Sequence, residues 1–277
     1  MSAPREPGPV VVGPPPGTDV WHIVLDVDPE AAVPVGALLD DEERRRAGRL
    51  RDSRAATRFV VAHGAVRSVL AGYLGATGGT LHWARGPNGK PYFDGPWRRW
   101  QWSLSRSGGH AMLAVRLHDP VGVDLEEIRN DVRATALAAR FMPPDEAAAV
   151  SREADQLSRS ALYHRLLSRK EACVKASGGR LLDGLCLRVL VPGIVEGTGA
   201  YDGERWDLRD LPAPPGFVAT LATVGDRPQR LRMFEWDWRS RREDPVGIGP
   251  HHPEPSPDGP GLAAAGGLLV PASRGPA

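Results

Sequence analysis

Strict alternation of apolar and acidic residues marks the segment Val121-Gly122-Val123-Asp124-Leu125-Glu126. A period of two predicts a β-strand whose apolar side chains point to one face, while Asp124 and Glu126 point to the other. Carboxylates two residues apart on a strand lie about 7 Å apart at Cα and can converge on a hard cation such as Mg²⁺. Gly122 has no side chain to block close approach of a ligand or a neighbouring strand. A solvent-facing edge strand would carry the same pattern, so this segment alone does not define a site.

A second set of polar residues shares one face of the helix predicted over residues 156–176. At about 100° per residue, four side chains form one narrow stripe: His164, Ser168, Glu171 and Lys175. The opposite side is apolar and includes Cys173, which we interpret as a small buried hydrophobe rather than a nucleophile. A Glu-Lys pair four residues apart also stabilises any helix by a few tenths of a kcal/mol. Together, however, strand and helix offer three carboxylates and one ammonium, a set that suits Mg²⁺ and a pyrophosphate.

The composition of the chain argues against several classes of protein. The 277 residues carry 35 basic and 34 acidic side chains, a net charge of +1, which argues against a protein that coats nucleic acid. No run approaches about 18 consecutive apolar residues, so we expect no membrane span. The proline-rich first residues lack a signal-peptide pattern, and two cysteines cannot form a metal site alone. We therefore expect a reduced, cytoplasmic protein that binds neither nucleic acid nor membrane.

Proline and glycine divide the chain into a body and two flanking segments. Residues 1–17 hold nine of them, and residues 240–277 are similarly rich, so both segments are predicted to be disordered. Apolar periodicity predicts strands and helices in both halves of the body, which indicates an α+β fold. The strands are expected at 20–27, 81–85, 100–105, 111–117, 121–128, 185–191, 205–208, 217–223 and 230–238. Helices are expected at 131–150, at 156–176 and over a buried stripe formed by Phe59, Ala62, Val66, Val69 and Tyr73.

Two motifs together resemble a known family. The strand at residues 121–126 is followed about 40 residues later by Leu167-Ser168-Arg169-Lys170-Glu171-Ala172-Cys173-Val174-Lys175. The pair resembles the signatures of the 4′-phosphopantetheinyl transferases, V/I-G-V/I-D-x-E and W/F-S/T/C-x-K-E-A/S-x-x-K. Length and layout are similar to the two-lobed, surfactin-synthetase-activating (Sfp-like) class rather than the small trimeric synthases. The resemblance implies an α+β fold with two similar α/β lobes related by pseudo-twofold symmetry, which we place at 18–120 and 121–239.

Further segments fit the same family. Asn88-Gly89-Lys90-Pro91-Tyr92 resembles its G-K-P segment, and Trp102-Ser103-Leu104-Ser105-Arg106-Ser107 resembles its F-N-x-S-H-S segment. Phe141 and Glu146 match an F-x-x-x-x-E pattern. The resemblance implies that Mg²⁺ is bound by Asp124, Glu126 and Glu171. It also implies that coenzyme A is bound by Arg46, Arg58, Lys90, Pro91, Ser105, Arg106 and Lys175, the last at the pyrophosphate.

Three positions depart from the family pattern. Arg106 stands where the family has histidine, and arginine can still donate two hydrogen bonds to a phosphate. Leu167 replaces the aromatic residue that opens the helix motif. Glu43 lies near the position of a nucleotide-binding lysine, for which Arg44 or Arg46 could substitute. The contacts to the 3′-phosphate are therefore the part of the site that the sequence defines least.

The resemblance implies a specific reaction. The protein would transfer the 4′-phosphopantetheine of coenzyme A to a serine of an acyl or peptidyl carrier protein and release adenosine 3′,5′-bisphosphate in a Mg²⁺-dependent step. Glu171 and Lys175 are the expected catalytic residues, as base and as charge-stabilising group. The sequence does not identify the carrier, which could belong to polyketide, nonribosomal-peptide or fatty-acid synthesis. A role in secondary metabolite biosynthesis is expected. We expect a monomer that meets acidic carriers through a surface including Arg133, Arg140 and Met142.

Two other functions fit parts of the pattern. A Mg²⁺-dependent phosphohydrolase or nuclease would also use three acids and a lysine, but Glu127 and Ile128 stand where a nuclease places its lysine, and the net charge is near zero. A catalytically degenerate coenzyme A-binding module is the second alternative. Retention of all three acids and Lys175 argues against it.

Overall fold

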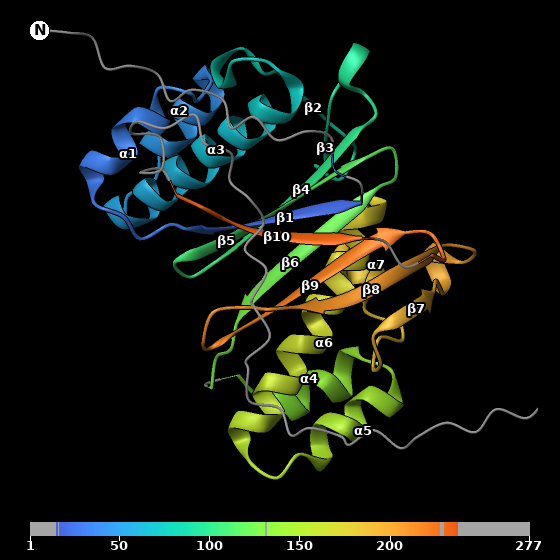
Figure 1. Ribbon diagram of the computed structural model, residues 1–277. Coiled ribbons are helices and arrows are strands. Elements are labelled where there is room, and N and C mark those ends of the chain that lie inside the picture. The colour runs from blue at the N-terminus through green and yellow to red at the C-terminus, as the bar shows by residue number, and fades with distance from the viewer. Residues whose placement is uncertain (1–14, 16, 131, 228–229, 238–277) are drawn as a thin grey trace, which may run out of the picture.

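The computed structural model describes residues 15, 17–130, 132–227 and 230–237. The predicted disordered segment 240–277, and all of segment 1–17 except Pro15 and Gly17, therefore lie outside the described residues. Two four-stranded sheets and two long helices make up most of the described part, which is an α+β fold as predicted (Figure 1). The helices α1 to α3 lie together on one side of the first sheet, and α4 and α5 lie at the opposite end of the molecule.

The first sheet has the strand order β10-β1-β5-β4. Its strands are β1 (Thr18–Val24), β4 (Trp100–Ser107), β5 (His110–Leu117) and β10 (Leu231–Trp236), and three helices accompany it: α1 (Pro29–Gly36), α2 (Asp41–Gly48) and α3 (Ser53–Leu74). Helix α3 begins where Asp52 accepts a hydrogen bond from the backbone of Arg54 and ends at Gly75, which has φ 61°. All five residues of its predicted stripe are buried, so that prediction is confirmed.

The second sheet has the strand order β6-β9-β8-β7 and is antiparallel throughout. Its strands are β6 (Val121–Glu127), β7 (Gly193–Glu196), β8 (Arg205–Leu211) and β9 (Phe217–Val224). Helix α6 (Gln156–Ser177) packs against β6 and β9; it begins after Asp155, which accepts from the backbone of Ser158, and ends at Gly178 with φ 69°. Shorter elements are α4 (Ala134–Phe141), α5 (Pro144–Arg152), α7 (Leu181–Gly184), and the paired strands β2 (Ala84–Arg85) and β3 (Pro91–Tyr92).

Strand β10 connects the two ends of the described chain. It pairs with β1 in parallel, with Thr18 opposite Leu231 and Ile23 opposite Trp236. The Arg232 guanidinium donates two hydrogen bonds of 2.7 Å to the buried Asp19 carboxylate. Residues after the second sheet therefore complete the first one.

Two predicted elements were wrong. The helix expected over 131–150 is two helices, because Pro143 and Pro144 interrupt it, and a residue before proline avoids helical backbone angles. The strand expected over 185–191 does not form. Its carbonyls at Val189 and Leu190 instead accept hydrogen bonds from Arg169, so its apolar pattern reflects burial beneath α6 rather than pairing in a sheet.

The other predicted strands exist with shifted ends. The strand at 81–85 is reduced to β2, and Trp238, the last residue of the strand expected at 230–238, lies outside the described residues. None of the helices in the described ranges has the length and apolar character needed to cross a bilayer.

Candidate functional site

Three carboxylates meet where β6 lies on α6. Asp124 and Glu126 extend from the strand and Glu171 from the helix, and one oxygen of each lies within 4.8 Å of the others. Asp124 is only 1 % exposed, whereas Glu126 and Glu171 are half-buried. The two periodicities seen in the sequence thus converge on one cluster, which we call the acidic cluster.

Gly122 explains why the strand and the helix come so close. A Cβ atom at this position would lie 2.0 Å from the carbonyl oxygen of Ala172 and 2.4 Å from the backbone nitrogen of Ala176. The backbone of β6 therefore rests directly on the backbone of α6. The sequence predicted a close approach by a ligand or another strand, and the partner is a helix instead.

Lys175 and Ser105 complete the polar contacts of the acidic cluster. The Lys175 Nζ atom lies 2.5 Å from Asp124 Oδ1 and 3.4 Å from Glu171 Oε2. It also donates to the Ser105 hydroxyl at 2.9 Å, and that hydroxyl donates to Asp124 Oδ1 at 2.9 Å. Asp124 Oδ2 is buried and accepts no hydrogen bond from the described residues. One oxygen of the most buried carboxylate is therefore left for a cation.

Crowding of the carboxylates changes their acidity. Burial, followed by the charges of Asp124 and Glu171, raises the pKa of Glu126 to about 7. Burial and the Asp124 charge likewise raise the pKa of Glu171. For Lys175, burial favours the neutral amine, but the Asp124 and Glu171 charges outweigh it and raise its pKa. A single ammonium faces three acids, so the donor set fits a hard divalent cation.

A cavity of about 320 Å³ opens beside the acidic cluster and takes its walls from both halves of the chain. Five of the residues that the resemblance assigns to coenzyme A line it: Arg46, Lys90, Pro91, Arg106 and Lys175. Trp102, from the segment that resembles F-N-x-S-H-S, also lines the cavity. Sequence reasoning missed Trp83, and it missed Gly178 and Gly179 at the end of α6. No local pattern marks these residues, because they meet the cavity only through the fold.

Two guanidinium groups gather around one aromatic ring at the edge of this cavity. The Arg46 and Arg106 guanidinium carbons lie 5.4 Å and 5.3 Å from the centroid of the Phe59 ring. His63 stacks on the same ring at 4.0 Å. Neither arginine has a carboxylate partner among the described residues. Two cations placed beside one ring can together bind an anion.

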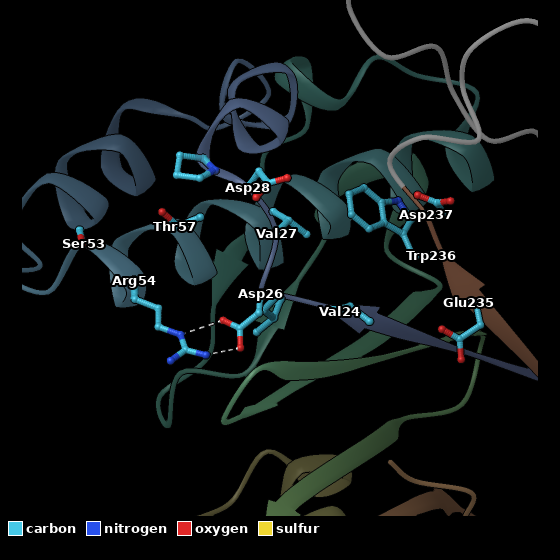
Figure 2. A pocket seen from close by; sticks show the side chains of 12 residues that line it. Val24, Asp26, Val27, Asp28, Ser53, Arg54, Thr57, Glu235, Trp236 and Asp237 are labelled. Atoms are coloured by element: carbon cyan, nitrogen blue, oxygen red, sulfur yellow. Dashed lines mark hydrogen bonds and ion pairs between the residues drawn. The ribbon is translucent and has the colours of Figure 1, made fainter. Parts of the chain in front are cut away.

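Arg58 and Ser105 do not line this cavity. Arg58 and Arg54 both bind the Asp26 carboxylate, and these hydrogen bonds, Arg58 first, hold the pKa of Asp26 well below its ordinary value. Figure 2 shows Asp26 with Arg54 in a separate cavity of about 860 Å³, walled on its other side by Trp236. The Asp26 carboxylate of that larger cavity is thus paired with two guanidinium groups. Ser105 instead points to Asp124.

The turn that carries Lys90 holds the end of α6. Lys90 Nζ donates to the carbonyl of Ala176, and burial lowers its pKa to about 8. Asn88 donates to the carbonyl of Gly178 at 3.0 Å and accepts from Arg180 at 3.2 Å. These hydrogen bonds join the turn at residues 88–90, in the first half of the chain, to the end of α6 in the second half.

Glu43 is hydrogen-bonded within the fold and does not line the cavity. It is buried, accepts a 2.6 Å hydrogen bond from Arg67 and lies 2.8 Å from His63, while its backbone donates to Asp40. Arg44 pairs with the neighbouring Asp41 at 2.8 Å. Of the two possible substitutes named from the sequence, only Arg46 therefore reaches the cavity.

Lys170, the first lysine of the helix motif, is buried inside the protein in an ion pair. It forms a 2.6 Å ion pair with Glu146, and both side chains are 0 % exposed. Lys170 also donates to the carbonyl of Leu187, and Glu146 accepts from the backbone of Val189 at 2.6 Å. The pair joins α5, α6 and the segment after α7 just behind Glu171.

We expect Lys170→Met to lower the free energy of unfolding by about 3 kcal/mol, because it leaves the Glu146 carboxylate buried without its counter-charge. Urea unfolding measures the loss. The double variant Lys170→Met with Glu146→Gln should regain most of it, since the glutamine oxygen still accepts from Val189. A double variant no more stable than Lys170→Met would contradict the ion-pair explanation.

Comparisons with known proteins support the family resemblance. The model of the 4′-phosphopantetheinyl transferase superfamily matches residues 120–193, which include all three acids and Lys175. The 4′-phosphopantetheinyl transferase HetI of a Nostoc species is 28% identical over 209 residues, covering 74% of this chain and 87% of that protein. A putative 4′-phosphopantetheinyl transferase of a Synechocystis species, slr0495, is 32% identical over 151 residues, covering 54% of this chain and 61% of that protein.

Proposed function

The chain belongs to the 4′-phosphopantetheinyl transferase superfamily, and from this premise we propose that the acidic cluster and the cavity beside it form its reaction site. As a transferase of this family, it moves 4′-phosphopantetheine onto a carrier protein. The proposal rests on one observation: Lys175, which contacts the crowded carboxylates, also lines a cavity that carries two guanidinium groups without a carboxylate partner among the described residues.

We infer that Asp124, Glu126 and Glu171 hold Mg²⁺, with Asp124 Oδ2 as the oxygen that lacks any other partner. When bound, the ion offsets the charge of the coenzyme A pyrophosphate. Lys175, which is held by Asp124 and Ser105, would place its ammonium at the same pyrophosphate. The raised pKa of Glu171 suits a group that accepts a proton.

The reaction follows from these positions. The Glu171 carboxylate takes the proton of the carrier serine, whose oxygen forms a bond to the β-phosphorus of coenzyme A. The bond from that phosphorus to the bridging oxygen breaks, and adenosine 3′,5′-bisphosphate leaves. Lys175 stabilises the charge that develops on the leaving oxygen. Every atom of coenzyme A is then found either on the carrier or in the bisphosphate.

The test is the intact mass of an apo carrier protein after incubation with this protein, coenzyme A and Mg²⁺. We expect a gain of one phosphopantetheine group and an equal amount of adenosine 3′,5′-bisphosphate. Release of the bisphosphate without a carrier would favour a phosphohydrolase. Binding of coenzyme A without release across several carrier types would favour a degenerate binding module.

We propose that Arg46 and Arg106 bind the 3′-phosphate of coenzyme A. Arg106→Ala should then raise the KM for coenzyme A about tenfold, because a charge-assisted hydrogen bond is lost. The KM for 3′-dephospho-coenzyme A should stay unchanged. Steady-state kinetics with both substrates measure the difference, and Arg54→Ala, whose guanidinium binds Asp26, is the matched control. Equal losses for both substrates would contradict the assignment.

We further propose that carrier proteins dock at a groove of about 550 Å³ between α4 and α7. Phe141 and Leu182, 41 % and 77 % exposed, offer apolar contact there. Arg140 supplies positive charge, whereas Arg188 is paired with Asp145 at 3.1 Å. Met142, which the sequence analysis assigned to the carrier surface, lines the same groove. Arg133 stands before α4 and is not among the lining residues.

Reversing the charge of this groove should weaken carrier binding. We expect Arg140→Glu to raise the KM for an acidic carrier about tenfold without changing the KM for coenzyme A. The control is Arg152→Glu, at the exposed end of α5. The same KM for the carrier in Arg140→Glu and in the parent would place the carrier elsewhere.

Several finer expectations stay proposals. These are the Sfp-like class, the division into pseudo-symmetric lobes at 18–120 and 121–239, the monomeric state and the cytoplasmic location. Gel filtration with light scattering tests the monomer directly. Strand β10 pairs with β1 across the proposed lobe boundary, so the two lobes are expected to unfold in one transition.

A further inference from the structure

Strands β4 and β6 lie side by side although they belong to different sheets. Their connection runs through side chains. The backbone nitrogen of Val123 donates to the Ser103 hydroxyl at 3.2 Å, and the backbone nitrogen of Glu127 donates to the Ser107 hydroxyl at 3.0 Å. Ser103 and Ser107, four residues apart on one face of β4, thus act as acceptors for the free edge of β6.

The register of these bonds is constant. Both serines bond the residue 20 positions later in the chain. Ser105, between them, turns its hydroxyl to the Asp124 side chain and Lys175 instead. The two backbone contacts therefore flank the stretch of β6 that carries Asp124 and Glu126.

Three different contacts fix this stretch of β6. Its second edge is paired with β9, from Val121 opposite Thr223 to Glu127 opposite Phe217. One face rests on α6 through Gly122. The edge toward β4 is held by the serine hydroxyls alone among the hydrogen bonds of the described residues between these two strands. A shift of that edge would move both carboxylates relative to Glu171.

We propose that Ser103 and Ser107 are positioning residues, which hold the edge of β6 so that Asp124 and Glu126 converge with Glu171 on one cation. The inference rests on the proposed metal-binding role of the acidic cluster and adds two residues that touch neither the carboxylate oxygens nor the reacting atoms. Ser107 gives the cleaner test, since Ser103 also lines the coenzyme A cavity.

The experiment compares Ser107→Ala with the full parent chain. Titration with Mn²⁺ in a calorimeter should show about tenfold weaker binding, and kcat should fall by a similar factor at an unchanged KM for coenzyme A. Hydrogen exchange should become faster at the Glu127 amide, which has lost its acceptor. Ser107→Thr keeps the hydroxyl and should restore all three readouts. Gln101→Ala, on the same strand but bonded to Arg98, is the control.

Two results would overturn the proposal. One is a folded Ser107→Ala variant whose Mn²⁺ affinity and kcat stay within about twofold of the parent. The other is a lower melting temperature with unchanged metal affinity, which would make the serines mere stabilisers of the sheet contact. Asp124→Asn is titrated alongside: if it binds Mn²⁺ like the parent, the proposed metal site itself is wrong, and that failure is distinct from failure of the positioning role.

Discussion

Replacing Asp124 by asparagine is expected to lower the rate of phosphopantetheine transfer about a thousandfold, because the site loses one of the three charges that would bind the cation beside the pyrophosphate. Asparagine has nearly the same shape, so the packing of β6 on α6 should survive. It removes the charge that holds Lys175 at 2.5 Å, and it changes a carboxylate whose buried Oδ2 atom has no hydrogen-bond partner among the described residues. Transfer to a saturating apo carrier, followed by intact mass, measures the rate.

The control for this variant is Glu196→Gln, which removes a carboxylate from the exposed surface pair with Arg205. It should transfer at the parent rate, since surface ion pairs contribute little. Circular dichroism and the melting temperature verify that Asp124→Asn is folded. A folded Asp124→Asn protein with the parent rate would refute the assignment of the acidic cluster to the reaction.

Replacing Gly122 by alanine should affect stability and activity together. The added Cβ would lie 2.0 Å from the carbonyl oxygen of Ala172, and backbone cannot swing away as a flexible side chain can. We expect a loss of more than about 3 kcal/mol in the free energy of unfolding, at the upper end for overpacked sites. In the fraction that stays folded, β6 must move off α6, which should reduce transfer at least about a hundredfold.

Urea unfolding and single-turnover transfer measure the two effects of this change. Gly48→Ala is the matched control, because a Cβ at that position meets no atom within 4 Å. It should leave the rate unchanged and the stability equal or slightly higher. If Gly122→Ala unfolds at the parent urea concentration, the contact between β6 and α6 is looser than the structure indicates.

The acidic cluster could be predicted from the sequence because its strand residues and its helix residues each follow the regular spacing of their own element. Alternation put Asp124 and Glu126 on one strand face, and helical spacing put Glu171 and Lys175 on one stripe. However, such local patterns do not predict which distant residues a side chain contacts in the folded protein. No spacing in the sequence indicates that Lys170 is buried with Glu146, or that Glu43 pairs with Arg67.

The predictions that failed have a common physical cause. An apolar pattern reports that a segment is buried and not how its backbone is bonded. Leu187 and Val189 are buried as a strand would be, yet nearby carbonyls are used by Arg169 and Lys170. Arg58, which the resemblance assigns to coenzyme A, instead donates to Asp26, 32 residues earlier in the chain. Such long-range pairs decide which of several similar arginines stay available for a ligand.

The parallel pairing of β10 with β1 constrains the order in which the protein can form during its synthesis. Asp19 and its partner Arg232 are separated by 213 positions, so the first sheet lacks one strand until almost the whole folded body has left the ribosome. Until then, the outer edge of β1 is open to pairing with other chains. Closing so long a loop is slow compared with forming α3 or α6. Chaperone demand during translation should therefore fall only after residues 231–236 have emerged.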